Sequence, residues 1–130
     1  MLDLNFERLQ SVTNADPEFK LTARLLNARL RIFADREAHI ITIKDGAIHS
    51  VNRNPTLFDE WDIDVGGPAE DWRKILQRIP PPLYQDLFPA AAHKGFRMAG
   101  NLELLFSYYP AFRRLIDIMR EVANAPAAAA

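Results

Sequence analysis

The side chains best suited to chemistry in this sequence are three histidines and a row of acids. His39 and His49 fall on the two strands of a predicted hairpin, where the expected register points them to opposite faces of the sheet, so they cannot share a metal ion. Glu60, Asp62 and Asp64 alternate with apolar residues, and we interpret them as the solvated face of a half-buried strand. A solvated row lacks the two different environments that separate the pKa values of an acid–base pair. Neither group predicts a metal or catalytic site.

Other patterns that carry chemistry are missing from the sequence as well. Cysteine does not occur, which excludes disulfides, thiolate metal sites and thiol nucleophiles. No serine sits in a nucleophile elbow, and Gly66-Gly67-Pro68 lacks the lysine and the spaced glycines of a phosphate loop. The 16 basic residues nearly balance the 17 acidic ones, so the net charge of −1 gives no general attraction to nucleic acid. We therefore predict no catalytic residue, no metal, no cofactor and no nucleic-acid partner.

The C-terminal half instead carries a surplus of aromatic and apolar residues, interrupted by prolines. A short helix held between Pro80-Pro81-Pro82 and Pro89 can stand away from the body of a domain and leave room for an apolar cavity. Taken singly, each of these apolar residues is explained as core, so core and cavity compete for the same side chains. The candidate ligand-binding residues are Tyr84, Leu87, Phe88, Phe96, Met98, Leu105, Phe106, Tyr109 and Phe112. We expect them to desolvate the ligand, with the hydroxyl of Tyr84 or Tyr109 offered to a head group.

The clearest signal for the elements that position these residues is a hairpin. Runs of β-branched residues at 38–44 and 47–51 flank Asp45-Gly46, a dipeptide typical of a two-residue turn with positive φ. The implied pairs are Lys44 with Ala47, Ile43 with Ile48, and Thr42 with His49.

Helix signals lie on both sides of this hairpin. Asp16-Pro17-Glu18 supplies an N-cap, a proline at the first helical position and an acid in the first turn. The last helix is apolar over more than half of its circumference, and we expect Pro110 to kink or divide it. The expected order is a helix over 16–27, strands over 30–34, 38–44, 47–51 and 60–65, a helix over 69–79, a short helix over 83–88, a strand over 95–99 and a helix over 102–123. This partial segregation of strands from helices predicts an α+β fold with a mostly antiparallel sheet.

Three segments, taken in this order and at this spacing, carry a family resemblance. They are the hairpin at 40–51, the run Trp61-Asp62-Ile63-Asp64-Val65 with Gly67-Pro68-Ala69-Glu70-Asp71-Trp72 after it, and the run from Gly95 to Leu102. The sequence resembles the sterol carrier protein 2-like domain family over about residues 16–122. The stretch from Pro80 to Lys94 resembles an insertion, and the peroxisomal signal of eukaryotic members is missing, so a bacterial variant is favoured.

The resemblance implies a five-stranded, mostly antiparallel sheet backed by helices, with an apolar cavity between the sheet and the C-terminal helices. It also implies the binding or transfer of fatty acyl chains, sterols and similar lipids, since members of the family act in this way. Other members are accessory domains or proteins beside enzymes. The resemblance implies no catalytic residues in this sequence.

The length of 130 residues predicts one domain, which we place at 1–123, followed by an Ala/Pro tail at 124–130 that we expect to be disordered. The N-terminus lacks the basic start and apolar run of a secretory signal, and no stretch approaches the ~20 apolar residues of a membrane span. We therefore expect a cytoplasmic location.

The leading hypothesis is a non-enzymatic protein that binds or transfers a lipid or another apolar small molecule. The alternative is an interaction module, either a homodimer or the partner of an enzyme, with Phe112 or Met119 of the last helix buried between chains. A third and weaker hypothesis is a small enzyme that acts on an apolar substrate. It would require Asp86 or His93 to lie desolvated in a cavity.

Overall fold

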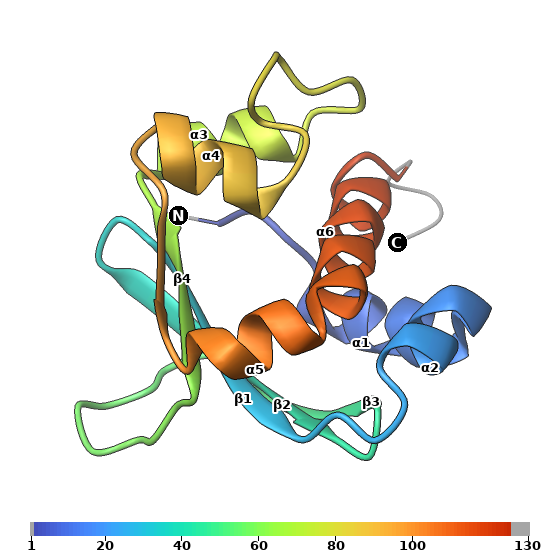
Figure 1. Ribbon diagram of the computed structural model, residues 1–130. Helices are drawn as coiled ribbons and strands as arrows, with labels where there is room; N and C mark the ends of the chain where they lie inside the picture. Colours follow the sequence, from blue (N-terminus) through green and yellow to red (C-terminus); the bar gives the residue numbers. More distant parts are fainter. Residues whose placement is uncertain (1, 126–130) are drawn as a thin grey trace.

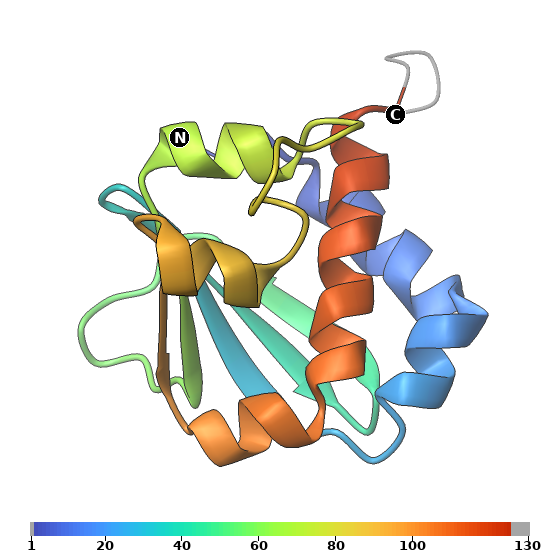
Figure 2. The same cartoon turned by 45° about the horizontal axis from the view of Figure 1, so that its top comes forward.

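In the computed structural model, which describes residues 2–125, the helices cover one face of a five-stranded sheet, here called the inner face (Figures 1 and 2). The strands are β1 (Ala28–Ala34), β2 (Glu37–Lys44), β3 (Ala47–Asn52), β4 (Ile63–Gly67) and β5 (Arg97–Gly100). The helices are α1 (Phe6–Ala15), α2 (Pro17–Thr22), α3 (Ala69–Ile75), α4 (Leu87–His93), α5 (Leu102–Ser107) and α6 (Tyr109–Ala123). In both views α6 lies between α1 and α2 on one side and α3 and α4 on the other. The α+β class is as predicted.

The strand order is β3-β2-β1-β4-β5, and the pairing of β1 with β4 is parallel. The sheet is therefore mixed, and the prediction of a mostly antiparallel sheet was wrong. The reason lies in the segment 53–62, which crosses from the β3 edge past β2 and β1 and enters β4 in the direction of β1. Periodicity along a strand reports which residues face the core, but it does not report the strand's neighbour.

The hairpin of β2 and β3 forms at the predicted turn, and the two pairs nearest to the turn are as predicted. Beyond them a bulge shifts the register, so that Thr42 lies opposite Ser50 rather than His49. At the same place Asn14 of α1 accepts the Ile48 N–H at 2.8 Å and donates to the Ile48 carbonyl at 2.9 Å. A side chain from a distant helix thus takes part in the hydrogen bonding of this edge strand, which the turn dipeptide does not reveal.

The acidic strand differs from its prediction as a half-buried strand with a solvated face. Every residue of β4 is buried, because the strand lies between β1 and β5 and is not an edge. Asp64 is only 2% exposed, and its two carboxylate oxygens pair with Arg31 at 2.7 Å and Arg97 at 3.4 Å. Asp62 accepts the backbone N–H of Arg29 at 2.7 Å. The alternating acids are therefore partners for arginines on neighbouring strands.

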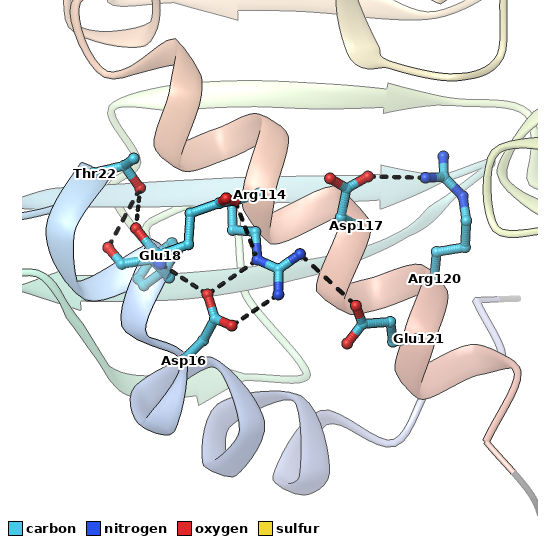
Figure 3. A network of polar contacts seen from close by, with 8 residues as sticks. Asp16, Glu18, Thr22, Arg114, Asp117, Arg120 and Glu121 are labelled. Atoms are coloured by element: carbon cyan, nitrogen blue, oxygen red, sulfur yellow. Dashed lines mark hydrogen bonds and ion pairs between the residues drawn. The ribbon is translucent and has the colours of Figure 1, made fainter.

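The N-terminal helices form around two capping residues. Asn5 caps α1, a helix that the sequence reasoning did not predict, although Phe6 and Leu9 show helical spacing and are buried. Asp16 caps α2 as predicted and accepts the Phe19 N–H at 2.8 Å. Arg114 of α6 donates to both oxygens of the same carboxylate, at 2.8 and 3.0 Å (Figure 3). The hydrogen bond from Arg114 is the main reason why the pKa of Asp16 is lowered.

The proline-rich half follows its prediction only in part. The last predicted helix is divided as expected, and Pro110 lies in the first turn of α6, where a missing N–H costs no helical bond. The short helix was misplaced, since α4 begins at Leu87 beneath its cap Asp86 and contains Pro89 in its first turn. Leu83 has φ of 72°, which is incompatible with a helix at that position. α3 ends at Ile75, so the helix predicted to run to Ile79 is shorter than expected, and Ile79 is exposed.

Two residues of the predicted tail lie within the described part. Asn124 is the C-cap of α6, and its side-chain amide donates to the Leu76 carbonyl at 2.7 Å. Residues 126–130 lie outside the described residues. Within 2–125, the helices are too short or too polar to cross a membrane.

Candidate ligand-binding site

The space between the inner face of the sheet and the helices is lined entirely by apolar residues. Alternate residues of β1 and β4 point toward the helices, which contribute one residue of α3, one of α4 and four of α6. The lining residues are Leu30, Ile32, Val65, Trp72, Leu87, Phe112, Leu115, Ile116 and Met119. The Trp72 indole N–H donates to the Phe33 carbonyl at 2.7 Å, so the one polar group among these side chains is satisfied.

The void that these residues enclose has a volume of about 10 Å³. A void of this kind needs roughly 10–15 Å³ to hold a single water molecule, so side chains fill nearly all of this space. The predicted apolar cavity is thus a packed core with a small void in this structure.

Of the nine candidate ligand-binding residues, Leu87 and Phe112 line this void. Phe96 is buried beside it, with its ring edge-on to Trp72 at a centroid distance of 4.9 Å. Leu105 of α5 is completely buried, and Met98 of β5 is partly buried against the core.

The three remaining aromatic candidates of α4, α5 and α6 form a cluster at the surface, here called the aromatic cluster: Phe88, Phe106 and Tyr109. Phe106 lies 6.1 Å from the ring of Phe88 and 6.0 Å from that of Tyr109. Phe88 is 50% exposed and Phe106 is 47% exposed. The cluster brings together residues of three separate helices at one place, and one of these helices, α4, also carries Leu87 to the void.

Three polar contacts attach the beginning of α4 and the two residues before it to α6. The Arg120 guanidinium donates to the Gln85 carbonyl at 3.2 Å. The Phe88 N–H donates to the Tyr109 hydroxyl at 2.9 Å, and the Asp86 carboxylate lies 3.9 Å from the Arg113 guanidinium. Burial is the main cause that raises the pKa of Tyr109, and the hydrogen bond with Asp86 and the charge of Asp86 raise it further, so the hydroxyl stays protonated. Leu87 and Ala90 of the short helix α4 belong to the same continuous core as the sheet and α6, so apolar packing adds to these polar contacts.

The other candidate hydroxyl is already engaged. The Tyr84 hydroxyl donates to the Asp71 carboxylate at 3.1 Å, and the ring lies beneath the ammonium groups of Lys74 and Lys94 at 5.2 and 5.6 Å. Tyr84 therefore fixes the segment before α4 and does not line the void.

The sequence reasoning missed the sheet side of this site. Two signals in the sequence could have found it. Leu30 and Ile32 alternate with arginines, and Val65 follows Ile63 by two residues, which puts both on the same face of a strand. It also missed a cleft of about 1060 Å³ on the opposite, outer face of the sheet, between the strands and the segment 53–62.

Residues 2–125 hold no group of three or more side chains suited to binding a metal ion. Asp86 caps α4, and His93 is exposed at its other end, so neither lines the void. Phe112 and Met119 are at most 1% exposed, so the face of α6 that the interaction hypothesis required is used within the chain.

The architecture defines a class of α+β protein in which a mixed five-stranded sheet and a set of short helices enclose an apolar interior. The chain has a sterol carrier protein 2-like fold. It matches a crystal structure of sterol carrier protein 2 with a TM-score of 0.71 at 17% identity, over 89% of this chain and 93% of that one. It matches a conserved hypothetical protein from Thermus thermophilus, described as possibly a sterol carrier protein, with a TM-score of 0.66 at 18% identity, over 95% and 92% of the two chains.

A third similar structure is that of the UbiJ-SCP2 ubiquinone synthesis protein, with a TM-score of 0.56 at 18% identity, over 85% of this chain and 86% of that one. No family model and no curated protein matches the sequence. The resemblance stated from the sequence is thus confirmed for the fold.

Proposed function

We propose that this protein binds the apolar chain of a lipid, or a similar apolar small molecule, between the inner face of its sheet and the helices α4, α5 and α6, without catalysing a reaction. The observation that carries the proposal is the void lined only by apolar residues, with the short helix α4 and an exposed aromatic cluster beside it. The similarity of the fold to sterol carrier protein 2 supports the same interpretation.

Entry of the ligand takes place by displacement of α4. Moving α4 withdraws Leu87 from the void and exposes Phe112 and Met119 to the incoming chain. The aromatic cluster then forms the entrance, and the Tyr109 hydroxyl, released from the Phe88 N–H, binds a polar head group. The cytoplasm remains the expected location.

The energetics permit such an opening. Each methylene group transferred from water to an apolar site contributes about 0.8 kcal/mol, so a chain of about 16 carbons contributes on the order of 10 kcal/mol before ordering costs. The polar contacts between α4 and α6 include one neutral hydrogen bond and one ion pair with an exposed arginine, each of which contributes only about 1 kcal/mol or less. Withdrawing the buried Leu87 from the core costs about 1.5–3 kcal/mol in addition. The sum stays below the contribution of the bound chain.

The test is a titration with hexadecanoate, followed by NMR of the two tryptophan indole N–H groups. Trp72 lines the void, whereas Trp61 lies on the outer face, so the two signals report on different places. We expect saturable shifts of the Trp72 signal and a complex with one bound chain in native mass spectrometry.

A matched pair of variants locates the entrance. Phe106→Ser removes part of the aromatic cluster, and Phe58→Ser removes an equally large side chain that is 94% exposed in the segment 53–62. We expect weaker binding only for Phe106→Ser. Absence of saturable binding to the wild-type protein contradicts the proposal, and equal losses in both variants contradict the placement of the entrance.

A further inference from the structure

The entrance beside α4 holds an ion pair between two helices. Asp86, the N-cap of α4, has a carboxylate oxygen 3.9 Å from the Arg113 guanidinium of α6. Arg113 is one turn from Tyr109 on the same side of α6, because residues four apart are neighbours on a helix surface. The pair therefore lies next to the aromatic cluster, where the apolar chain of a ligand is expected to enter.

The Asp86 carboxylate lies close to groups of both helices. Burial is the main cause that raises the pKa of Tyr109, a hydrogen bond with Asp86 and the charge of Asp86 raise it further, and the charge of Arg113 lowers it. The same carboxylate accepts the Leu87 N–H at 2.7 Å. Its side chain is only 15% exposed, whereas that of Arg113 is 69% exposed. The carboxylate beside the guanidinium and the hydroxyl of α6 thus belongs to α4.

Displacement of α4 separates this carboxylate from its partners on α6. Asp86 directly precedes Leu87, so withdrawal of Leu87 from the void also carries Asp86 away. Arg113 stays behind, because it belongs to α6. Within residues 2–125 Arg113 makes no second ion pair, and Asp117, one turn further along α6, is bound by Arg120 at 3.0 Å. The open form therefore presents a guanidinium and a hydroxyl at its entrance.

The charge of the head group then decides whether the lost contact is restored. A carboxylate head group accepts hydrogen bonds from the same guanidinium and hydroxyl that Asp86 has left. The hydroxyl of an alcohol or a sterol carries no charge and leaves the guanidinium to water, and an ammonium group is repelled by it. Opening costs the same for every ligand, but only an anion restores the ion pair.

We propose that the ligand is an amphiphile with a carboxylate head group, and that this carboxylate replaces Asp86 on Arg113 and Tyr109 when α4 is displaced. Arg113 is then the residue that determines specificity for the head group. The exchange rests on the proposed function, because the apolar chain must enter the void that Leu87 leaves.

Three probes with the same alkyl chain separate the head group from the chain: dodecanoate, 1-dodecanol and dodecylammonium. At about pH 7.5 the first is an anion, the second is neutral and the third is a cation. Each is titrated into the full chain and followed by the Trp72 indole N–H signal. We expect dodecanoate to bind about five-fold more tightly than 1-dodecanol, which is the contribution of a partly exposed ion pair, and dodecylammonium to bind most weakly. About 1 M sodium chloride should narrow the difference.

Two failures are distinguishable in this titration. Absence of saturable binding for all three probes contradicts the proposed function. Equal affinities for dodecanoate and 1-dodecanol leave the proposed function in place and overturn the assignment of the head group.

A matched pair of variants tests the role of Arg113. Arg113→Gln removes the guanidinium at the entrance, and Arg24→Gln removes an exposed guanidinium in the turn after α2, which lies across α6 from α4 (Figure 1). We expect the preference for dodecanoate over 1-dodecanol to disappear in Arg113→Gln and to remain about five-fold in Arg24→Gln. A preference that survives in Arg113→Gln overturns the assignment. Both side chains are exposed, and circular dichroism checks that each variant is folded.

Asp86→Asn tests the exchange of carboxylates. Asparagine caps a helix about as well as aspartate, so α4 keeps its N-cap while the ion pair is lost. Opening then becomes easier for every ligand, and we expect dodecanoate and 1-dodecanol to bind more tightly by the same factor of about two to five. A gain for dodecanoate alone would show that Asp86 stays beside the head group in the complex. That result, or an unchanged affinity for both probes, overturns the exchange.

Discussion

The contact between Asp16 and Arg114 offers the most direct quantitative test of how α6, the main helical wall of the interior, is held in place. Asp16 caps α2, and its carboxylate accepts two hydrogen bonds from Arg114 of α6, 98 residues further along the chain (Figure 3). The side chains of Asp16 and Arg114 are only 12% and 23% exposed. The exposure of this pair is therefore intermediate. Fully exposed ion pairs contribute little to stability, and breaking a fully buried pair costs much.

This geometry sets the expected magnitudes. Asp16→Asn keeps an oxygen for the helix cap but removes the charge, so we expect a loss of about 1.5 kcal/mol in the free energy of unfolding. Asp16→Ala removes the cap as well, which adds about 1 kcal/mol. Glu121→Gln is the matched control, because Glu121 is 60% exposed and lies 3.7 Å from the same guanidinium, and we expect a loss of less than about 0.5 kcal/mol.

The assay is urea unfolding followed by circular dichroism, with Asp16→Asn, Arg114→Gln and the double variant forming a thermodynamic cycle. Because the pKa of Asp16 is lowered in the folded protein, the stabilisation is present above the carboxyl's ordinary pKa of 3.8 and is lost as the pH falls through the folded value. The difference in stability between the wild type and Asp16→Asn should therefore narrow below about pH 4. A coupling energy below about 0.5 kcal/mol, or a difference that does not change with pH, would refute the reasoning.

Three further predictions concern the sheet. In Gly66→Ala the new Cβ would lie 2.1 Å from the Phe33 carbonyl oxygen, so we expect protein that is largely unfolded by circular dichroism, and a native spectrum would contradict the strand packing. Trp72→Phe leaves that carbonyl without its donor and should lower the free energy of unfolding in urea by about 2 kcal/mol, whereas an unchanged value would show that the bond is dispensable. Burial, followed by the charge of Arg53, lowers the pKa of His39, so the unfolded chain binds more protons below pH 6.5 and thermal stability should fall from about pH 7 to pH 5. This fall should be smaller in His39→Gln, and an identical pH profile in both proteins would exclude His39 as its source.

The elements that the sequence predicted well are those set by neighbouring residues. Asp45-Gly46 forms the hairpin turn, Asp16 caps α2, and Pro110 marks the division between α5 and α6. In each case the decisive interaction spans only a few residues, so the local pattern contains the necessary information. The prediction failed where the local preference allows two positions. Pro89 was placed after the end of a helix, but a proline is also accepted in the first turn of a helix, which is where it lies in α4.

Strand neighbours and burial were decided by tertiary contacts. The crossover segment 53–62 places β4 between β1 and β5, and this position turns the acids of the strand from solvated groups into partners of arginines. The sequence places Asp64 on one face of a strand, but only the fold brings Arg31 and Arg97 to that face. The alternation of apolar and polar residues along a strand is the same whether its neighbouring strands are near or far in the sequence.

The same division holds for the candidate sites. The sequence by itself determined that the chain has an apolar interior and no thiol, and its motif order indicated the sterol carrier protein 2-like fold. Only the tertiary structure decided which apolar residues line the void, that Phe88, Phe106 and Tyr109 gather at the surface, and that Asp86 meets Arg113 beside them. The physical reason is that residue type fixes what a side chain can bind, whereas long-range packing fixes which side chains meet.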